Sequence, residues 1–219
     1  MYKKMMWNIF RYLADFSHLI SVVILLHKML KKRSCSGVSL KTQFLYLVVF
    51  IARYVNSSFF RPPVYNIIFK MFYIFSAALI CFLMWKPLNQ TYDKRHDTFR
   101  ASIIIVFAIV PSYFSMPYKT WAYFFFAYSL WVECLAIIPQ LMLIGRTMKF
   151  DVLNRDYVFF LSIYRLFYLL NWIYKMVTET GTTPKVVWIT GIIQTLVYSD
   201  FIYEYLKLKV SGKSNILPI

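Results

Sequence analysis

Seven long apolar stretches, separated by short polar connections, constrain this chain more than any other feature of its sequence. Each has about 20 residues, the length that an α-helix needs to cross the hydrocarbon core of a bilayer. Only 16% of the residues are charged, too few to coat a soluble globule that hides runs such as IIIVFAIV and LYLVVFIA in one small core. We therefore predict an all-α polytopic membrane protein with seven transmembrane helices. The predicted helices cover residues 8–28, 40–60, 63–86, 101–117, 119–144, 157–177 and 186–206.

The distribution of lysine and arginine among the connections predicts which end faces the cytoplasm. With the N-terminus in the lumen, the cytoplasmic connections carry about 15 basic residues and the lumenal ones about 6, in line with the positive-inside rule. This distribution, rather than nucleic-acid binding, explains the net charge of +16. We expect a lumenal N-terminus, a membrane domain over residues 8–206 and a cytoplasmic C-terminal tail over residues 207–219. Seven helices permit a three-plus-one-plus-three arrangement, although the sequence shows no clear internal repeat.

The sequence contains no pattern that indicates an enzyme or a metal site. Its three cysteines, Cys35, Cys81 and Cys134, are an odd number and lack the spacing of a disulfide framework or a metal centre. There is no Gly-rich phosphate loop, no His/Glu metal motif and no Ser or Cys nucleophile motif. We expect a protein that is not an enzyme and that needs no cofactor or metal.

Ionisable side chains occur inside the predicted membrane helices, where they are costly and usually mark function. Arg11, Asp15 and His18 share one face of the first helix because they are four and three residues apart. The other ionisable residues within the spans are Arg53, Glu133, Arg165, Lys175 and Asp200.

Each of these residues also has a structural explanation. Arg11 could extend to the lumenal surface or pair with Asp15, four residues further along the helix. Arg165 could pair with Glu133 or with Asp200 and so join two helices. For a single residue, such a role is at least as common as a functional one.

Three of the cations together indicate a binding site. Arg11, Arg53 and Lys175 lie in the lumenal halves of their helices, and few lumenal acids are available to neutralise them. Three cations that converge from one side predict a site for an anionic ligand. Polar and aromatic neighbours could supply hydrogen-bond donors and apolar walls: Tyr54, Tyr164, Tyr168, Asn171 and Trp172.

His18 predicts a response to pH, because histidine is the side chain whose charge changes within the pH range of cell compartments. Beside Glu133 and Tyr164 it would form a proton-sensitive network. The alternative is a neutral buried histidine that only bonds to a neighbour. The sequence does not show whether these three residues meet.

Several segments, in order along the chain, resemble one known family. They are NIFRYLADFSHL, RSCSGVSLKTQ, ARYV, TYDKRHDTFR, AIIPQL, YRLFYLLNWIY, QTLVYSDF and the final LPI. From about Asn8 onward the chain is similar to the Lys-Asp-Glu-Leu (KDEL) receptors, also called ER lumen protein-retaining receptors. The resemblance implies that residues 1–7 are an N-terminal extension.

The resemblance implies both a fold and a function. The fold has seven helices arranged as in SWEET and PQ-loop transporters, with Pro139 and Gln140 as the PQ pair. Members of the family are not enzymes. They capture escaped ER-resident proteins in the Golgi by the C-terminal tetrapeptide, return them in COPI vesicles, and release them at the higher pH of the ER. The implied partners are these C-terminal peptides, the COPI coat and the lipid bilayer of Golgi and ER membranes.

The resemblance also implies roles for the charged residues. Arg11 and Arg53 match the arginines that bind the acidic groups and the carboxylate of the ligand. Lys175 stands where the family usually has a third arginine, which predicts looser capture because lysine lacks the bidentate fork. The residues that match the pH-sensing group of the family are His18, Glu133 and Tyr164.

The last helix and the tail carry the implied cytoplasmic response. Asp200 matches an acid implicated in the switch that exposes cytoplasmic lysines. The family typically has paired lysines near its end for coat recruitment, whereas Lys213 is followed here by Ser214. We expect Lys207, Lys209 and Lys213 to serve this role.

Departures from the family pattern surround the fourth ligand residue from the end. Asn56 stands where the family has an aspartate, and Tyr123 and Phe126 align with its glutamate and tryptophan. Both carboxylates that would attract a Lys or His of the ligand are therefore missing, and Phe is a weaker cation–π partner than Trp. We predict a preference for an uncharged residue there, as in a Ser-Asp-Glu-Leu signal.

Two other functions would also use charges inside the membrane. A proton-coupled, SWEET-like transporter of a small anion or peptide is the main alternative. It is disfavoured because the cytoplasmic halves of the spans are aromatic and poor in polar groups. A purely structural scaffold would leave the cluster of cations unexplained.

Overall fold

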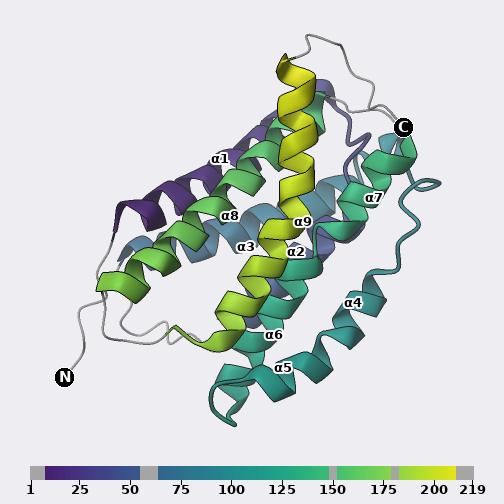
Figure 1. Ribbon diagram of the computed structural model, residues 1–219. Coiled ribbons are helices and arrows are strands. Elements are labelled where there is room, and N and C mark those ends of the chain that lie inside the picture. Colours follow the sequence, from purple (N-terminus) through teal and green to yellow (C-terminus); the bar gives the residue numbers. More distant parts are fainter. Residues whose placement is uncertain (1–7, 55–63, 148–151, 179–182, 211–219) are drawn as a thin grey trace.

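The computed structural model describes residues 8–54, 64–147, 152–178 and 183–210, and all regular elements in these ranges are helical. Figure 1 shows a bundle of helices of unequal length. The elements are α1 (Ile9–Lys32), α2 (Leu40–Tyr54), α3 (Val64–Trp85), the 3-10 turn η1 (Asn89–Thr91), α4 (Ala101–Phe107), α5 (Ile109–Ser115), α6 (Trp121–Leu135), α7 (Ile138–Thr147), α8 (Val152–Thr178) and α9 (Lys185–Val210). The predicted all-α class is confirmed for the described residues.

Four helical stretches are long and apolar enough to cross a membrane. They are Ile9–Lys32, Val64–Trp85, Trp121–Thr147 and Asp156–Thr178, and Ala101–Ser115 is a shorter apolar stretch. Large apolar side chains such as Phe75 and Phe114 are exposed, at 64% and 81%, as expected for a surface that meets lipid. The helices therefore fit a membrane protein, whereas the number of seven crossings and their orientation stay predictions.

Two of the predicted helices, 101–117 and 119–144, are each divided in two. α4 ends at Phe107 and α6 ends at Leu135, four residues before Pro111 and Pro139 respectively. Proline has no N–H to donate to the carbonyl four residues earlier, and its ring clashes with that carbonyl. The prediction of continuous helices is wrong at these points because it did not take these two prolines into account.

α1 and α8 lie side by side in opposite directions (Figure 1). At one end of the pair, Asn8 Nδ2 donates to Asn171 Oδ1 at 2.8 Å. At the other end, Lys28 Nζ lies 2.5 Å from Asp156 Oδ2. We call the first end of the bundle, where α1, α3 and α9 begin and α2 and α8 end, the cavity end. The opposite end, where α1 and α3 end and α2 and α4 begin, is the loop end.

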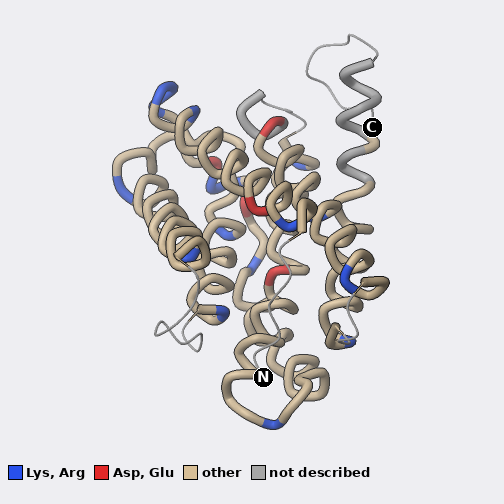
Figure 2. The backbone as a smooth tube through the Cα atoms, turned by 90° about the vertical axis from the view of Figure 1, so that its left-hand side faces the viewer, with Lys and Arg blue, Asp and Glu red and all other residues tan. Residues whose placement is uncertain are grey.

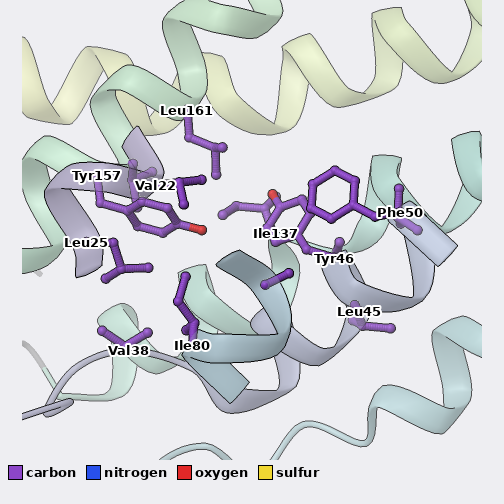
Figure 3. Close-up of a cluster of buried hydrophobic side chains, with 14 of the residues drawn as sticks. Val22, Leu25, Val38, Leu45, Tyr46, Phe50, Ile80, Ile137, Tyr157 and Leu161 are labelled. Carbon is purple, nitrogen blue, oxygen red and sulfur yellow. The ribbon is translucent and has the colours of Figure 1, made fainter. Parts of the chain in front are cut away.

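A buried apolar core lies between the two ends. Figure 3 shows side chains of α1, α2, α3 and α8 that point toward one another, among them Val22, Tyr46, Ile80 and Leu161. Ile137, between α6 and α7, is fully buried in the same cluster. Each of these elements therefore buries one apolar stripe and leaves another exposed.

At the loop end, hydrogen bonds fix the connection between α1 and α2. Gln140 Nε2 donates to the carbonyl of Gly37, and its Oε1 accepts from the amide of Ser39, both at 2.8 Å. The amide of Gln140 donates to Thr42 Oγ1 at 3.0 Å. Gly37 has a φ of 76°, which suits a residue without a Cβ. Gln140 is fully buried, so its side chain supplies hydrogen bonds to backbone groups of this connection in place of water.

Two aspartates of the 86–100 segment complete this arrangement. Asp97 accepts from Ser39 Oγ at 3.0 Å and from the Tyr92 hydroxyl at 2.6 Å. Asp93 accepts from the amide of Gly37 at 2.6 Å. Burial, and then the bond to Asp97, raises the pKa of Tyr92, so this hydroxyl stays a donor at physiological pH. We call the set Gly37, Ser39, Thr42, Tyr92, Asp93, Asp97 and Gln140 the loop clamp.

Candidate functional site

A cavity of about 700 Å³ lies at the cavity end, among α1, α2, α3, α6, α8 and the start of α9. Its lining includes Arg11, Asp15 and His18, so the predicted shared face of α1 points into it. Cavities of this size are typical of small-molecule and peptide sites.

Five cations from four helices line the cavity. The three that the sequence predicts to converge are all there: Arg11 on α1, Arg53 on α2 and Lys175 on α8. Lys70 on α3 and Arg165 on α8 also line it. Figure 2 shows basic positions inside the bundle as well as at the helix ends. Lys70 lies 5.5 Å from the ring centre of Tyr54, and it was missed although it is a charge within a predicted span.

Glu133 of α6 joins two of these cations. It forms ion pairs with Arg53 and Arg165, and it accepts from the Tyr164 hydroxyl at 2.8 Å. Arg53 Nε also donates to Ser129 Oγ at 3.1 Å. The expectation that few acids neutralise the cations is therefore wrong for Arg53. Of the two partners predicted for Arg165, the structure shows Glu133; a charge this buried needs such a partner.

Asp15 is the second carboxylate of the cavity. Arg11 Nε lies 3.8 Å from Asp15 Oδ2, which confirms the predicted pair. Asp15 also accepts from the hydroxyls of Tyr65, at 3.0 Å, and Tyr168, at 2.5 Å. Arg11 also donates from Nη2 to Asn66 Oδ1, at 3.1 Å. Asp15 thus connects α1 with α3 and α8, two contacts that the sequence did not reveal.

His18 lies between two tyrosine rings. Its ring is stacked on Tyr73 and on Tyr164, with ring centres 4.4 Å apart in both cases. It is 7% exposed. Because the Tyr164 hydroxyl donates to Glu133, one chain of contacts connects His18, Tyr164, Glu133 and Arg53. The sequence left open whether His18, Tyr164 and Glu133 meet, and the structure brings them together: His18 stacks on Tyr164, which bonds to Glu133.

The other residues predicted for ligand binding, the switch or coat recruitment divide into four groups. The cavity lining includes Tyr54, Phe126, Tyr168, Asn171 and Trp172. Tyr123 is absent from the lining; it is 39% exposed, and its ring centre lies 5.0 Å from that of Tyr118. Asn56 and Lys213 lie outside the described residues. Asp200, Lys207 and Lys209 belong to α9, but their side chains are outside the described part.

The chemistry of the lining suits an anion and not a metal ion. Among the described residues, no group of three His, Cys, Asp or Glu side chains could bind a metal. The lining has five cations and two carboxylates, which leaves an excess of three positive charges with His18 neutral. Lys175 forms no ion pair or hydrogen bond with another described residue. The cavity therefore offers charge to a ligand as well as space.

Comparison with known proteins places the chain in a family. The family model for the ER lumen protein retaining receptor matches residues 34–175. An ER lumen protein-retaining receptor of Entamoeba histolytica is 36% identical over 214 residues, which cover 98% of this chain and 100% of that one. The chain belongs to the ER lumen protein-retaining receptor family.

Further members of the receptor family show the same extent of similarity. ER lumen protein-retaining receptor A of Arabidopsis thaliana is 41% identical over 210 residues, 95% of this chain and 96% of its own. Receptor 3 of Xenopus laevis is 37% identical over 214 residues, 97% of this chain and 99% of its own. The resemblance found in the sequence is thus confirmed. The names describe receptors that retain ER lumen proteins, and none describes an enzyme.

Proposed function

We propose that this receptor binds the C-terminal tetrapeptide of ER-resident proteins in the cavity between α1, α2, α3, α6 and α8. The observation that carries the proposal is the excess of three cations over carboxylates in the lining. A peptide that ends in Asp-Glu-Leu has three negative groups, namely two side chains and the terminal carboxylate. The excess positive charge of the cavity therefore matches the number of negative groups on the peptide, and hydrogen bonds between charged groups are stronger than those between neutral ones.

Arg11 and Arg53 each bind an acidic group of the ligand in addition to the carboxylate that already holds them. Arg53 is paired with Glu133 and Arg11 with Asp15, so each guanidinium is held in position before the ligand arrives. A guanidinium has five N–H donors and can bond to a second carboxylate. Lys175 lies in the last turn of α8, where its ammonium meets the incoming peptide first. Asn171 and Trp172 extend the same wall of the cavity.

Binding is favoured by acid in this proposal. His18 faces Tyr73 of α3 and Tyr164 of α8, and the charges of Glu133, Arg165 and Arg53 act on its ring. An anionic peptide adds negative charge to this group of cations, which favours the charged form of His18. By reciprocity, protonation of His18 favours the peptide, so affinity falls as the pH rises toward neutrality.

The ligand's fourth residue from the end is uncharged in this proposal. Phe126 lines the cavity where the family has a tryptophan, and Tyr123 lies outside the lining. The two carboxylates of the described lining, Asp15 and Glu133, are already bonded to arginine and tyrosine side chains. A ligand Lys or His would therefore lack a counter-charge, and Ser is preferred.

The remaining proposals concern the membrane location of the receptor, its topology and its return to the ER. We place seven helices in Golgi and ER membranes, with the cavity end in the lumen and residues 207–219 in the cytoplasm. α1 to α3 and α6 to α9 form two groups of three spans, joined by α4 and α5; the close packing of α1 on α8 supports contact between the groups. Return to the ER uses the COPI coat through Lys207, Lys209 and Lys213, and Asp200 takes part in the switch that exposes them.

The test is binding of labelled peptides to the purified receptor at mildly acidic and neutral pH. The peptides differ only at the fourth residue from the end, Ser or Lys, and an amidated Ser-Asp-Glu-Leu peptide lacks the terminal charge. We expect acid-dependent binding, with Ser at least equal to Lys and with the amide much weaker.

The other outcomes separate the parts of the proposal. Acid-dependent binding that favours the Lys peptide would support the receptor function but contradict the preference for an uncharged fourth residue. Equal binding at both pH values would reject the role of His18. If no such peptide binds and labelled peptide accumulates in vesicles that contain the protein, the transporter alternative would replace the receptor.

A further inference from the structure

A second hollow of about 700 Å³ lies at the loop end, away from the cavity. We call it the loop-end groove. α2 contributes Leu40, Lys41 and Phe44, and α3 contributes Cys81, Phe82 and Trp85. The segment 97–102 forms the other side. α2 packs against both α3 and α4, so it forms the floor between them.

The walls of this groove are apolar and open to the surroundings. Phe44 is 45% exposed, Phe82 50% and Trp85 62%. Phe82 lies on α3, which is long and apolar enough to cross a membrane, and Phe44 lies within the predicted span 40–60, so we expect their exposed faces to meet acyl chains and not water. An occupant must therefore have a long apolar part.

The polar side of the groove is positively charged. Lys41 and Arg100 line it, and neither forms an ion pair with another described residue. The groove's acid, Asp97, is 5% exposed and already accepts bonds from Ser39 and Tyr92. This differs from the cavity, where Arg11, Arg53 and Arg165 all have carboxylate partners. The occupant must therefore carry an anionic group.

Both cations lie where apolar helix meets polar connection. Lys41 is the second residue of α2, and Arg100 directly precedes α4. Trp85 is the last residue of α3, and Lys86 Nζ lies 5.5 Å from its ring centre. Trp and basic residues in this combination are typical of the membrane–water interface. The groove thus begins at the headgroup level and continues into the hydrocarbon region.

We propose that the loop-end groove binds one anionic phospholipid of the leaflet at this end. Its phosphate lies between Lys41 and Arg100, and an acyl chain follows Phe44 and Phe82. Basic pockets between membrane helices commonly bind anionic headgroups in this way. A soluble anion would leave the apolar walls bare, and a neutral lipid would leave both cations without a partner. The proposal does not depend on the peptide ligand of the cavity.

The test is the lipid that stays bound to the purified receptor, measured by native mass spectrometry after exchange into mixed micelles. The micelles contain phosphatidylserine and phosphatidylcholine at equal concentration, so the two lipids compete for the receptor. The double variant K41Q/R100Q removes both cations of the groove. The control K119Q/K185Q removes two exposed cations outside it, with the same change of net charge.

We expect the wild type and the control to retain one phosphatidylserine in preference to phosphatidylcholine. The preference should fall by roughly 25-fold in K41Q/R100Q, because each basic residue near a headgroup contributes about fivefold. The single variant K41R, which still has Arg100, should keep most of the preference for phosphatidylserine. Size-exclusion elution and thermal unfolding establish that each variant is folded.

Three results would overturn the proposal. One is equal retention of both lipids by the wild type. Another is an equal loss in the groove variant and in the control. The third is displacement of the lipid by glycerol phosphate at the same concentration, because the site would then recognise the phosphate alone and not a membrane lipid.

Discussion

The two ends of the bundle use polar side chains in opposite ways. At the loop clamp, short side chains and one glutamine bond to backbone groups nearby and fill the space between them. At the cavity end, long charged side chains reach from separate helices and leave about 700 Å³ among them. The difference suits two tasks: polar groups that satisfy the backbone stabilise the fold, whereas charges that face a shared space are placed to meet the proposed ligand.

The two ends also differ in how they respond to protons. The loop clamp contains tyrosine and aspartate, and the raised pKa of Tyr92 keeps its hydroxyl a donor across the physiological range. The cavity end contains His18, and histidine is the residue type that ordinarily changes its charge between pH 5 and 8. We therefore expect a change of pH to alter binding without loosening the loop clamp.

The largest expected effect is loss of stability from Gln140→Leu at the loop clamp. The substitution removes the two bonds that the Gln140 side chain makes to the carbonyl of Gly37 and to the amide of Ser39, and the loss of a buried partner costs about 1–3 kcal/mol for each bond. The free energy of unfolding should fall by about 4 kcal/mol, while the folded fraction still binds peptide. Thermal unfolding in detergent measures this, with Q90L, an exposed glutamine, as the control. A small loss equal to that of Q90L would contradict the clamp.

Arg53→Gln should give the next largest effect, on binding. It removes a charged partner of the ligand, so affinity should fall by about 10- to 100-fold, as expected for one charge-assisted bond. The control K119Q should bind normally. Titration with labelled peptide at acidic pH measures both, and unchanged affinity in R53Q would place the ligand elsewhere.

Gly191→Ala tests how α9 positions a wall of the cavity. A Cβ at Gly191 would lie 2.7 Å from Trp172 Cη2 and closer still to Cζ3, so the indole must move. Overpacking of this kind costs about 1–3 kcal/mol, and the displaced ring should weaken peptide binding. G145A is the matched control, since no atom lies within 4 Å of its Cβ. The double variant G191A/W172F should recover stability relative to G191A, and failure to do so would refute the steric explanation.

Lys175→Arg should give the smallest effect, a gain of affinity. Arginine restores the bidentate fork that lysine lacks, at a site where lysine has no partner among the described residues. We expect the peptide to associate more tightly by about two- to fivefold, close to the value of one weak ion pair. A decrease of affinity would show that Lys175 does not meet the ligand.

Much of the fold could be predicted from the sequence, because apolar runs and basic connections are local signals. α1, α3 and α8 lie close to the predicted spans 8–28, 63–86 and 157–177. The breaks before Pro111 and Pro139 were predictable from the clash of proline with the preceding turn, but were not predicted.

The site could be predicted less completely, because it depends on how helices face one another. Spacing along α1 placed Arg11 and His18 on one face, and both line the cavity. No spacing could show that Glu133 joins Arg53 and Arg165, since that contact requires α2, α6 and α8 to be neighbours. Lys70 could have been found by the rule that identified the others.

The break before Pro139 makes α6 and α7 two separate helices with a joint at residues 136–137 instead of one continuous helix. Glu133 lies on the cavity side of the joint and Gln140 on the clamp side. A continuous helix would carry any tilt of Glu133 directly to Gln140. With the joint between them, we expect the half that lines the cavity to adjust to the proposed peptide while α7 keeps its hydrogen bonds at the loop clamp. In the proposed function, cargo can thus bind and leave repeatedly while the loop clamp stays in place.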